Sequence, residues 1–383
     1  MRFSVDAHAI GRKLTGNEVY VRNLLAGFAA VDQESEFIAY VSSDGLNGWV
    51  PCGFQARRVA RNPFLRLGYD LTRNLRRDRP DLVHVQYTAP PVCPAPVVVS
   101  VHDVSFVEHP EYFQPLRAMQ LRHTVRQTVM RAARVITGSE FSRDSIAGAY
   151  GLDPGQIAVV PNAASPVFRP IAPAAAAARV LTRFGISTPF LLTVGDLQPR
   201  KNQAGLVRAF AEMLQASPGL PHQLVVAGKP TWFAPQVYAA ARESGVAERI
   251  HFTGFVSDDD LLSLYNACEV FVFPSFYEGF GLPVLEAMAC GRAVACSNTS
   301  AFPEVADSAA ILFDPRSTRE MVRAMLDLVL DAELRARMKR LGSNRASQFS
   351  WRKTAEQTLE VYRDVAGRRG VRAEAGAMAS VLR

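Results

Sequence analysis

Two glutamates separated by seven residues, Glu278 and Glu286, lie in the segment 274–291, which reads Pro-Ser-Phe-Tyr-Glu-Gly-Phe-Gly-Leu-Pro-Val-Leu-Glu-Ala-Met-Ala-Cys-Gly. A carboxylate accepts paired hydrogen bonds from a diol such as ribose, and free N–H groups at a helix start can bind phosphate or sugar hydroxyls. The candidate N–H groups belong to Phe280, Gly281 and Leu282. The pattern favours an anion-and-sugar pocket; the alternative is a strand-loop-helix unit whose glutamates are merely solvated.

Adjacent cations occur at Arg200 and Lys201, which follow an apolar run over 190–194. Fixed cations of this kind suit the diphosphate of a nucleotide sugar. An exposed Arg-Lys pair is the alternative, but cations at a helix N-terminus oppose the helix dipole, and a bound anion would explain that misfit.

Two further residues occupy strand-to-helix connections. Gly16 lies in the segment 14–20, where backbone N–H groups can cradle phosphate, although a single glycine there is more often an ordinary turn. His102 directly follows the apolar run 97–101, which places it at a strand end, and Asp103 is next to it. A lone histidine is more often a hydrogen-bonded structural residue.

Elements that position these residues follow from apolar periodicity. Residues 269–273 read as a buried parallel strand, 274–282 as the loop after it, and Pro283 as the first residue of a helix. Similar strand-like runs alternate with helical stretches along the chain, and this alternation predicts parallel sheets flanked by helices. The expected strands are 3–5, 37–41, 82–85, 97–101, 135–137, 190–194, 224–227, 250–252, 270–273 and 293–296.

The segment Glu-Gly-Phe-Gly-Leu-Pro-Val-Leu-Glu over 278–286 resembles the signature of glycosyltransferase family 4, whose members are retaining enzymes of the GT-B fold. The resemblance covers nearly the whole chain in the family's order. Other matching segments are 101–103, 138–142, 159–162, 193–202, 225–228, 252–256 and 313–315.

This resemblance implies a metal-independent hexosyltransferase that moves a sugar from a nucleotide diphosphate sugar to a saccharide or lipid-linked acceptor in glycan synthesis. GDP-mannose is the expected donor, followed by UDP-glucose, with no cofactor. The leaving phosphate would itself accept the acceptor's proton during front-face attack, so no protein base is required. The expected catalytic residues are Glu278, Arg200, Lys201 and His102, and the expected donor-binding residues are Gly16, Phe280, Gly281, Leu282 and Glu286.

A chain of 383 residues predicts two domains. The expected fold is α/β, with two Rossmann-like parallel-sheet domains facing a cleft, because ligands of such sheets bind at the carboxyl ends of the strands. A proline-rich stretch over 161–178 marks the break. The expected domains are 1–169 on the acceptor side and 170–351 on the nucleotide-sugar side. A helical pattern over 354–365 precedes Gly367-Arg-Arg-Gly370 and an alanine-rich tail, and the resemblance implies that a terminal helix over 352–383 crosses back onto the first domain.

Composition limits the class of protein. No apolar run approaches the ~20 residues that span a bilayer, and no secretion signal is recognised, so we expect a cytoplasmic protein. The five cysteines include no Cys-x-x-Cys pair and indicate neither disulfides nor zinc. A formal net charge of +7 favours anionic partners.

Charged clusters admit two interpretations each. Asp258-Asp-Asp260 matches a metal-binding pattern, but Ser257 or Asp258 as N-cap before an acidic first helical turn is favoured. Eight arginines over 57–79, and others at 117, 122, 126, 131 and 134, are either solvated helix faces or a contact with an anionic membrane. In the membrane reading, Phe64, Leu65, Leu67 and Tyr69 dip into the interface; nucleic acid is disfavoured.

Two other functional classes stay open at this point. One is a catalytically idle GT-B protein that binds glycan or membrane, and the other is a GT-B epimerase or phosphorylase. A nicotinamide-dependent dehydrogenase is disfavoured because no Gly-x-Gly-x-x-Gly follows any strand.

Overall fold

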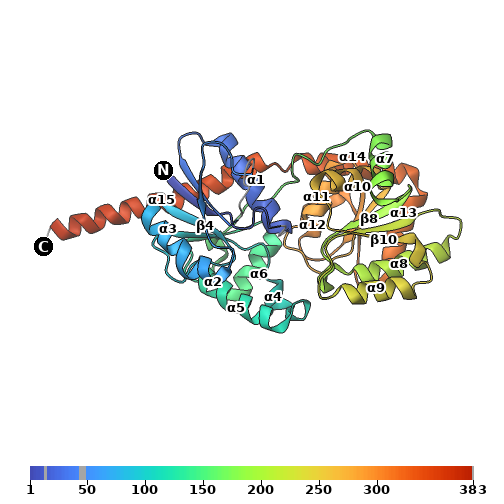
Figure 1. Cartoon of the computed structure of the whole chain (residues 1–383), viewed down its shortest axis with the longest axis horizontal. Coiled ribbons are helices and arrows are strands. Elements are labelled where there is room, and N and C mark those ends of the chain that lie inside the picture. The colour runs from blue at the N-terminus through green and yellow to red at the C-terminus, as the bar shows by residue number, and fades with distance from the viewer. Residues whose placement is uncertain (13–14, 43–48, 382–383) are drawn as a thin grey trace. The chain divides into compact units, whose positions relative to one another are not determined.

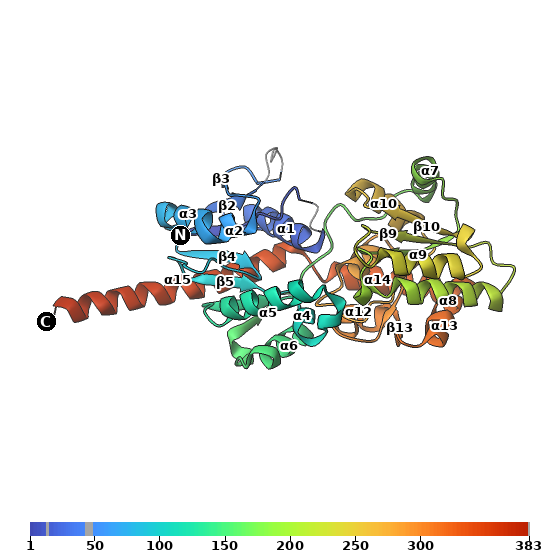
Figure 2. The ribbon, with the colours of Figure 1, turned by 60° about the horizontal axis from the view of Figure 1, so that its bottom comes forward.

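The computed structural model describes residues 1–12, 15–42 and 49–381, so Leu14 of the predicted phosphate loop and the last two residues of the predicted terminal helix lie outside it. The chain divides into two compact units, Met1–Asn162 with Ser350–Arg383, and Ala163–Phe349. Each unit contains one parallel sheet with helices on its faces (Figures 1 and 2). The predicted α/β class with two parallel sheets is confirmed.

The first unit has a seven-stranded sheet of order β3-β2-β1-β4-β5-β6-β7, in which every neighbouring pair is parallel. Its strands are β1 Arg2–Asp6, β2 Glu36–Val41, β3 Gln55–Arg58, β4 Leu82–Gln86, β5 Val97–Ser100, β6 Arg134–Thr137 and β7 Ile157–Val159. Its helices are α1 Thr15–Val31, α2 Pro63–Leu65, α3 Leu71–Asp78, α4 Ser105–Glu108, α5 Pro115–Val129, α6 Glu140–Tyr150 and α15 Trp351–Val381. Shorter turns are the π-helical Arg66–Asp70 and the 3-10 segments Pro110–Tyr112 and Pro154–Gln156.

The second unit has a six-stranded parallel sheet of order β10-β9-β8-β11-β12-β13. Its strands are β8 Phe190–Val194, β9 Gln223–Ala227, β10 Ile250–Gly254, β11 Val270–Phe273, β12 Ala293–Ser297 and β13 Ile311–Phe313. Its helices are α7 Pro173–Phe184, α8 Gln203–Ala216, α9 Ala234–Glu243, α10 Asp258–Ala267, α11 Leu282–Ala289, α12 Phe302–Ala306, α13 Thr318–Leu330 and α14 Ala332–Ser347. Turns of 3-10 helix occur at Pro199–Lys201, Ala247–Arg249 and Asp307–Ala309.

The three strands missing from the sequence prediction, β3, β7 and β13, are all sheet edges. β3 is a mostly exposed Gln-Ala-Arg-Arg segment, and the other two have three residues each. β3 lacks the continuous apolar run that identifies a buried strand, whereas β7 and β13 are apolar but contribute only three residues each to a sheet edge. Of the basic residues considered as solvated helix faces, Arg57 and Arg58 lie on β3, and Arg134 lies on β6 rather than on the preceding helix.

The linker 163–169, assigned to the first domain from the sequence, belongs to the second unit in the structure. Packing against α10 explains this assignment. The Phe168 ring lies 5.5 Å from the Tyr265 ring, and the Asn266 amide donates to the Arg169 carbonyl at 3.0 Å. The same Asn266 side chain accepts the Ile171 N–H at 3.0 Å.

Helix α15 joins the last residues of the chain to the first unit. The Thr354 hydroxyl donates to the Pro161 carbonyl at 2.7 Å, and the buried Tyr362 hydroxyl contacts His84 Nδ1 at 2.6 Å. A Cβ atom on Gly27 of α1 would lie 2.8 Å from the Ala355 Cβ, so the two helices cross at the closest distance that glycine permits. Beyond this contact α15 runs on through Gly367 and Gly370, because alanine, arginine and glutamate there favour helix.

No helix among the described residues combines the length and the apolar character needed to cross a membrane.

Candidate functional site

Arg200 and Lys201 lie in the 3-10 turn that follows β8. Asn202 ends the turn in the left-handed conformation, with φ of 53°, and the Asn202 amide donates to the Pro315 carbonyl at 2.8 Å. The Phe276 N–H donates to the Arg200 carbonyl at 2.7 Å. This bond connects the turn to the loop after β11, the neighbouring strand in the sheet.

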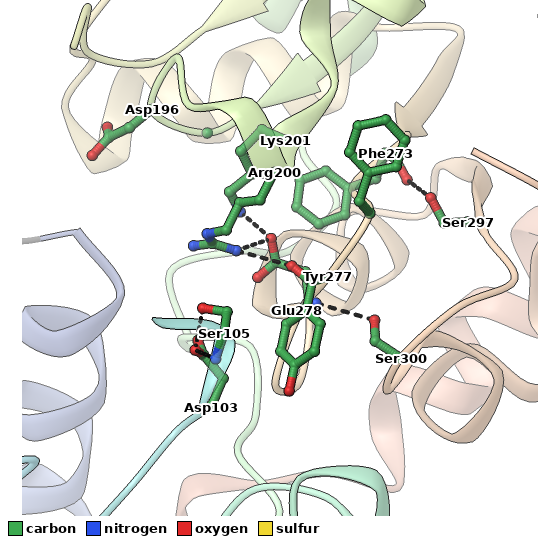
Figure 3. Close-up of polar contacts among 12 residues, drawn as sticks. Asp103, Ser105, Asp196, Arg200, Lys201, Phe273, Tyr277, Glu278, Ser297 and Ser300 are labelled. Carbon is green, nitrogen blue, oxygen red and sulfur yellow. Dashed lines mark hydrogen bonds and ion pairs between the residues drawn. The ribbon is translucent and has the colours of Figure 1, made fainter. Parts of the chain in front are cut away.

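Both cations donate hydrogen bonds to the carboxylate of Glu278, which lies in that loop (Figure 3). Its Oε1 accepts from Arg200 Nη1 and from Lys201 Nζ, each at 2.5 Å. Arg200 Nη1 also donates to the Tyr277 carbonyl at 3.1 Å, and the Glu278 N–H donates to the Ser300 hydroxyl at 3.1 Å. The sequence singled out all three charged residues, but it did not predict that they contact one another.

The charges of this trio are buried. Glu278 is 8% exposed and Lys201 9% exposed, and the Lys201 ammonium lies 4.7 Å from the centre of the Phe273 ring. Burial alone would raise the pKa of Glu278, but the charges of Arg200 and Lys201 hold that pKa below its usual value. Burial lowers the pKa of Lys201, and Glu278 opposes this shift. Two cations share one carboxylate, so the trio has a net charge of +1 that suits an anionic ligand.

Glu286 lies on α11, 5% exposed, and its Oε2 accepts the Tyr265 hydroxyl at 2.8 Å. Tyr265 belongs to α10 and is fully buried; burial first, and Glu286 second, raise the pKa of the Tyr265 hydroxyl well above its usual value. The phenol therefore stays protonated and orients the carboxylate. Sequence reasoning missed Tyr265, because an aromatic residue in an apolar helix gives no sign of a polar partner.

Phe280, Gly281 and Leu282 form the turn into α11. Gly281 is the N-cap with φ of 93°, and a Cβ there would lie 2.8 Å from the Phe302 ring. No hydrogen-bond partner for the N–H groups of these three residues is found in the part of the chain that the structure describes. The Phe280 side chain packs on Phe349 with ring centres 5.9 Å apart, so only its backbone is available to a ligand.

The acidic run 258–260 opens α10. The Ser257 hydroxyl accepts the Asp260 N–H at 3.2 Å, which confirms the predicted N-cap, and the Asp260 carboxylate accepts from Arg179 at 2.9 Å. No group of three or more histidine, cysteine, aspartate or glutamate side chains gathers in metal-binding proximity within the described ranges.

In the first unit, His102 follows β5. Its Nε2 contacts the Gln86 side-chain oxygen at 3.0 Å, and the Tyr20 ring lies edge-on to the imidazole with centres 4.6 Å apart. Burial lowers the pKa of His102 to about 4, so the ring is neutral near pH 7. Asp103 does not orient this ring: its carboxylate accepts from the Ser105 N–H and hydroxyl, at 3.0 and 2.6 Å, at the start of α4.

A series of buried polar contacts begins at the Tyr20 hydroxyl. The Tyr20 hydroxyl contacts the Ser100 hydroxyl at 2.8 Å, and Ser100 contacts His84 Nε2 at 2.7 Å. His84 in turn bonds Tyr362 of α15. Burial lowers the pKa of His84 to about 3, so this series is uncharged at neutral pH. No sequence pattern indicates these contacts, because the residues are far apart along the chain.

Gly16 lies in the first turn of α1 rather than in the loop before it. It is exposed, and a Cβ atom built on it would have no heavy atom within 4 Å. Neither a close contact nor a left-handed backbone therefore requires glycine at this position.

Two family models cover most of the chain. The model described as "Glycosyltransferase Family 4" matches residues 14–167, and the model described as "Glycosyl transferases group 1" matches residues 183–345. Among curated proteins, the chain is similar to O-antigen chain mannosyltransferase B of Escherichia coli, with 32% identity over 70% of each chain.

Solved structures with a similar fold include sucrose-phosphate synthase from Thermosynechococcus elongatus, at a TM-score of 0.78 and 18% identity, covering 96% of this chain and 100% of that one. HepE from Anabaena in complex with UDP-glucose gives a TM-score of 0.74 at 18% identity, covering 95% and 99%. These likenesses establish the two-domain fold class.

Proposed function

Because the chain belongs to glycosyltransferase family 4, we propose that it transfers a hexose from a nucleotide diphosphate sugar to a saccharide or lipid-linked acceptor, with retention of configuration and without a metal. The observation that carries this proposal is the buried trio of Arg200, Lys201 and Glu278, which has a net positive charge at the carboxyl edge of the second sheet.

Arg200 and Lys201 are proposed to bind the diphosphate. Each already donates to Glu278, and each cation has further donor hydrogens. As the bond between the sugar and its phosphate oxygen breaks, negative charge grows on that oxygen. Cations already held in place stabilise this charge more in the transition state than in the ground state.

The two glutamates are proposed to bind the hydroxyl groups of the donor. Glu286 is oriented by Tyr265 and would accept the ribose diol, and Glu278 would accept sugar hydroxyls. The N–H groups of Phe280, Gly281 and Leu282 would line the same pocket. In the first unit, neutral His102 is proposed as a further catalytic residue and Gly16 as a further donor-binding residue.

No protein base is required in this mechanism. The leaving phosphate would accept the proton of the acceptor hydroxyl as that oxygen attacks the same face of the sugar. GDP-mannose is the proposed donor, in keeping with the mannosyltransferase name of the relative from Escherichia coli. UDP-glucose is second, in keeping with the complex of HepE.

Thermal shifts against a panel of nucleotide diphosphate sugars, with and without EDTA, test the proposal. A ligand at about 100 times its dissociation constant adds about 2.7 kcal/mol of stability. We expect one sugar nucleotide to raise the melting temperature selectively and the shift to survive EDTA. No shift with any of them would favour an idle GT-B scaffold, and turnover with free phosphate in place of an acceptor would favour a phosphorylase.

The ribose assignment has its own test. Glu286→Ala should weaken donor binding by about 1–3 kcal/mol, because the ribose hydroxyls would lose a buried acceptor. Glu243→Ala is the control, since Glu243 is exposed at the end of α9. Equal donor affinity in the two variants would remove Glu286 from the ribose site.

A peripheral contact with an anionic membrane is the second proposal, and exposed apolar side chains beside arginines favour it. Phe64 is 78% exposed, Leu65 59% and Tyr69 61%, on the segment that also holds Arg73, whose guanidinium lies 6.0 Å from the centre of the Tyr69 ring. Apolar side chains between cations are typical of interfacial binding.

Sedimentation with phosphatidylglycerol vesicles tests this contact. The double variant Phe64→Ser, Leu65→Ser should lose binding, whereas Leu181→Ser, at a residue 55% exposed on α7 of the second unit, should keep it. Equal sedimentation of the two variants would refute the membrane contact.

A further inference from the structure

Three arginines gather at the carboxyl end of β1 in the first unit. Arg12 follows this strand, and Arg61 and Arg66 come from the segment between β3 and α3. Arg66 is 6% exposed, and its Nη1 donates to the carboxylate of Asp6, the last residue of β1, which is 1% exposed. His8 Nδ1 lies 3.0 Å from the other oxygen of the same carboxylate. Asp6 is therefore paired with Arg66, whose Nη1 also contacts His8 Nδ1 at 2.6 Å.

Among the described residues, no carboxylate pairs with Arg12 or Arg61 as Asp6 pairs with Arg66. Arg12 Nη1 donates to the backbone carbonyl of Arg61 at 3.3 Å, which holds the two residues side by side. Within residues 1–12, 15–42 and 49–381, neither guanidinium forms an ion pair. Burial, followed by the charges of Arg61 and Arg66, lowers the pKa of Arg12. The side chain is thus held, partly desolvated, near two like charges.

Within the described part of the chain, only Arg66 of this arginine cluster, Arg12, Arg61 and Arg66, contacts a carboxylate, that of Asp6. The carboxylates of Glu18 and Asp70 instead accept backbone N–H groups, those of Gly11 and Ala60, each at 2.8 Å. The buried Nε of Arg66 has no hydrogen-bond partner among the residues that the structure describes. A cluster of like charges is unfavourable unless an anion is bound there, and buried donors without partners carry a further cost.

We propose that the arginine cluster is an anion subsite for a phosphate group of the acceptor. The inference rests on the proposed transferase function, in which Arg200 and Lys201 of the second unit take the phosphates of the donor. Arginine suits this ligand because its planar fork of N–H groups donates in pairs to phosphate oxygens. Two guanidiniums without carboxylate partners, beside a third that is buried, offer such pairs to a tetrahedral dianion. The acceptor class is accordingly a phosphorylated or pyrophosphate-linked saccharide rather than a neutral sugar.

Calorimetric titration of the full chain with inorganic pyrophosphate tests the subsite. The double variant Arg12→Gln, Arg61→Gln spares buried Arg66, and the control Arg76→Gln makes a single charge change at an exposed residue of α3. We expect wild type and control to bind alike, and the double variant to lose one class of binding site or to bind there about tenfold more weakly. A double-variant isotherm identical to that of the wild type would overturn the subsite.

Melting temperatures separate a ligand site from a structural cluster. The double variant should melt no lower than the wild type without ligand, because two repelling charges are gone, and it should gain less from pyrophosphate. A lower melting temperature combined with an unchanged pyrophosphate shift would mean that the arginines serve the fold alone.

Sugar nucleotides and vesicles distinguish the remaining sources of phosphate. Donor-induced thermal shifts should be the same in the wild type and the double variant; their loss in the double variant alone would place the cluster in the donor site and overturn the acceptor assignment. If no sugar nucleotide shifts the melting temperature of any of these proteins, the wild type included, the transferase proposal fails. A difference in pyrophosphate binding between the wild type and the double variant would still support the subsite. Loss of phosphatidylglycerol vesicle binding with unchanged pyrophosphate affinity would assign the arginines to a lipid surface instead.

Discussion

The two units hold their candidate residues by opposite electrostatic means. In the second unit Glu278 is ionised between Arg200 and Lys201, and all three are largely removed from water. In the first unit buried His84 and half-buried His102 are neutral, and hydroxyl and amide groups hold them in place. The loop after β11 in the second unit is thus built to receive a charged ligand, whereas the end of β5 in the first unit orients an uncharged ring.

This contrast shows where each unit is vulnerable. Removing one partner of a buried ion pair destabilises the fold, because the remaining charge stays buried without a counter-charge. A buried neutral histidine lowers the stability of the fold at low pH, because the unfolded chain binds protons that the folded chain does not. Substitution should therefore test the second unit most severely, and acid the first.

The largest expected effect is that of Glu278→Ala. Removal of the carboxylate leaves Arg200 and Lys201 buried with no anion, and the free energy of unfolding should fall by about 3–5 kcal/mol. Urea-induced unfolding followed by circular dichroism measures the change, with Glu243→Ala as the control for loss of an exposed carboxylate. A loss below about 1 kcal/mol, typical of solvent-exposed ion pairs, would contradict the buried trio.

The next effect is the response of the first unit to acid. Burial lowers the pKa of His102 to about 4 and that of His84 to about 3, from the ordinary value of 6.5. Below pH 6.5 the unfolded chain binds protons that the folded chain rejects, so stability is complete above pH 6.5 and falls toward pH 4. Between pH 7.5 and 5.0 each histidine should cost about 2 kcal/mol.

Unfolding titrations of wild type and His102→Gln at these two pH values measure this dependence. The variant should lose about 2 kcal/mol less than the wild type on acidification. Glu278 contributes little in this window, because its lowered pKa means that its stabilisation is lost only in stronger acid. An equal acid response in the two proteins would contradict the neutral state of His102.

The smallest effects are expected at Gly281 and Gly16, the two glycines that the sequence predicts to bind the donor. Gly281→Ala combines a φ of 93° with a Cβ only 2.8 Å from Phe302 and should cost about 1–3 kcal/mol. Gly16→Ala meets open space in a helix and should instead gain about 0.5 kcal/mol. Melting temperatures of the two variants should shift in opposite directions. Destabilisation by Gly16→Ala would reveal a backbone requirement at that turn.

Much of the fold was predictable because central parallel strands are continuous apolar runs. All ten expected strands exist, and the loop containing Glu278 and the helix containing Glu286 follow from the strand before them. The Ser257 cap followed from the residue types alone. In each case the structure is determined by residues that are close together in the sequence.

The remaining features depend on contacts between distant segments. Glu278 is 78 residues from Arg200 and 77 from Lys201, and no periodicity encodes that they share one oxygen atom. The Tyr265 bond to Glu286 and the Ser100 bond to His84 likewise exist only after the strands are paired. The sequence predicts Gly16 in the loop before the helix, but it lies in the first turn of α1, because no residue type in that segment marks the exact start of the helix.

The return of α15 to the first sheet has a consequence for the order in which the protein is completed during synthesis. Residues 163–349 of the second unit are contiguous and leave the ribosome together, whereas the first unit also needs residues 350–383. Until Tyr362 emerges, His84 Nδ1 lacks the hydroxyl that it contacts in the complete protein, and Gly27 has no α15 to pack against. Domains fold as units as they are made. The half of the protein that begins translation is therefore the last to finish folding, and a nascent chain stalled before α15 exposes the face of α1 that α15 would cover.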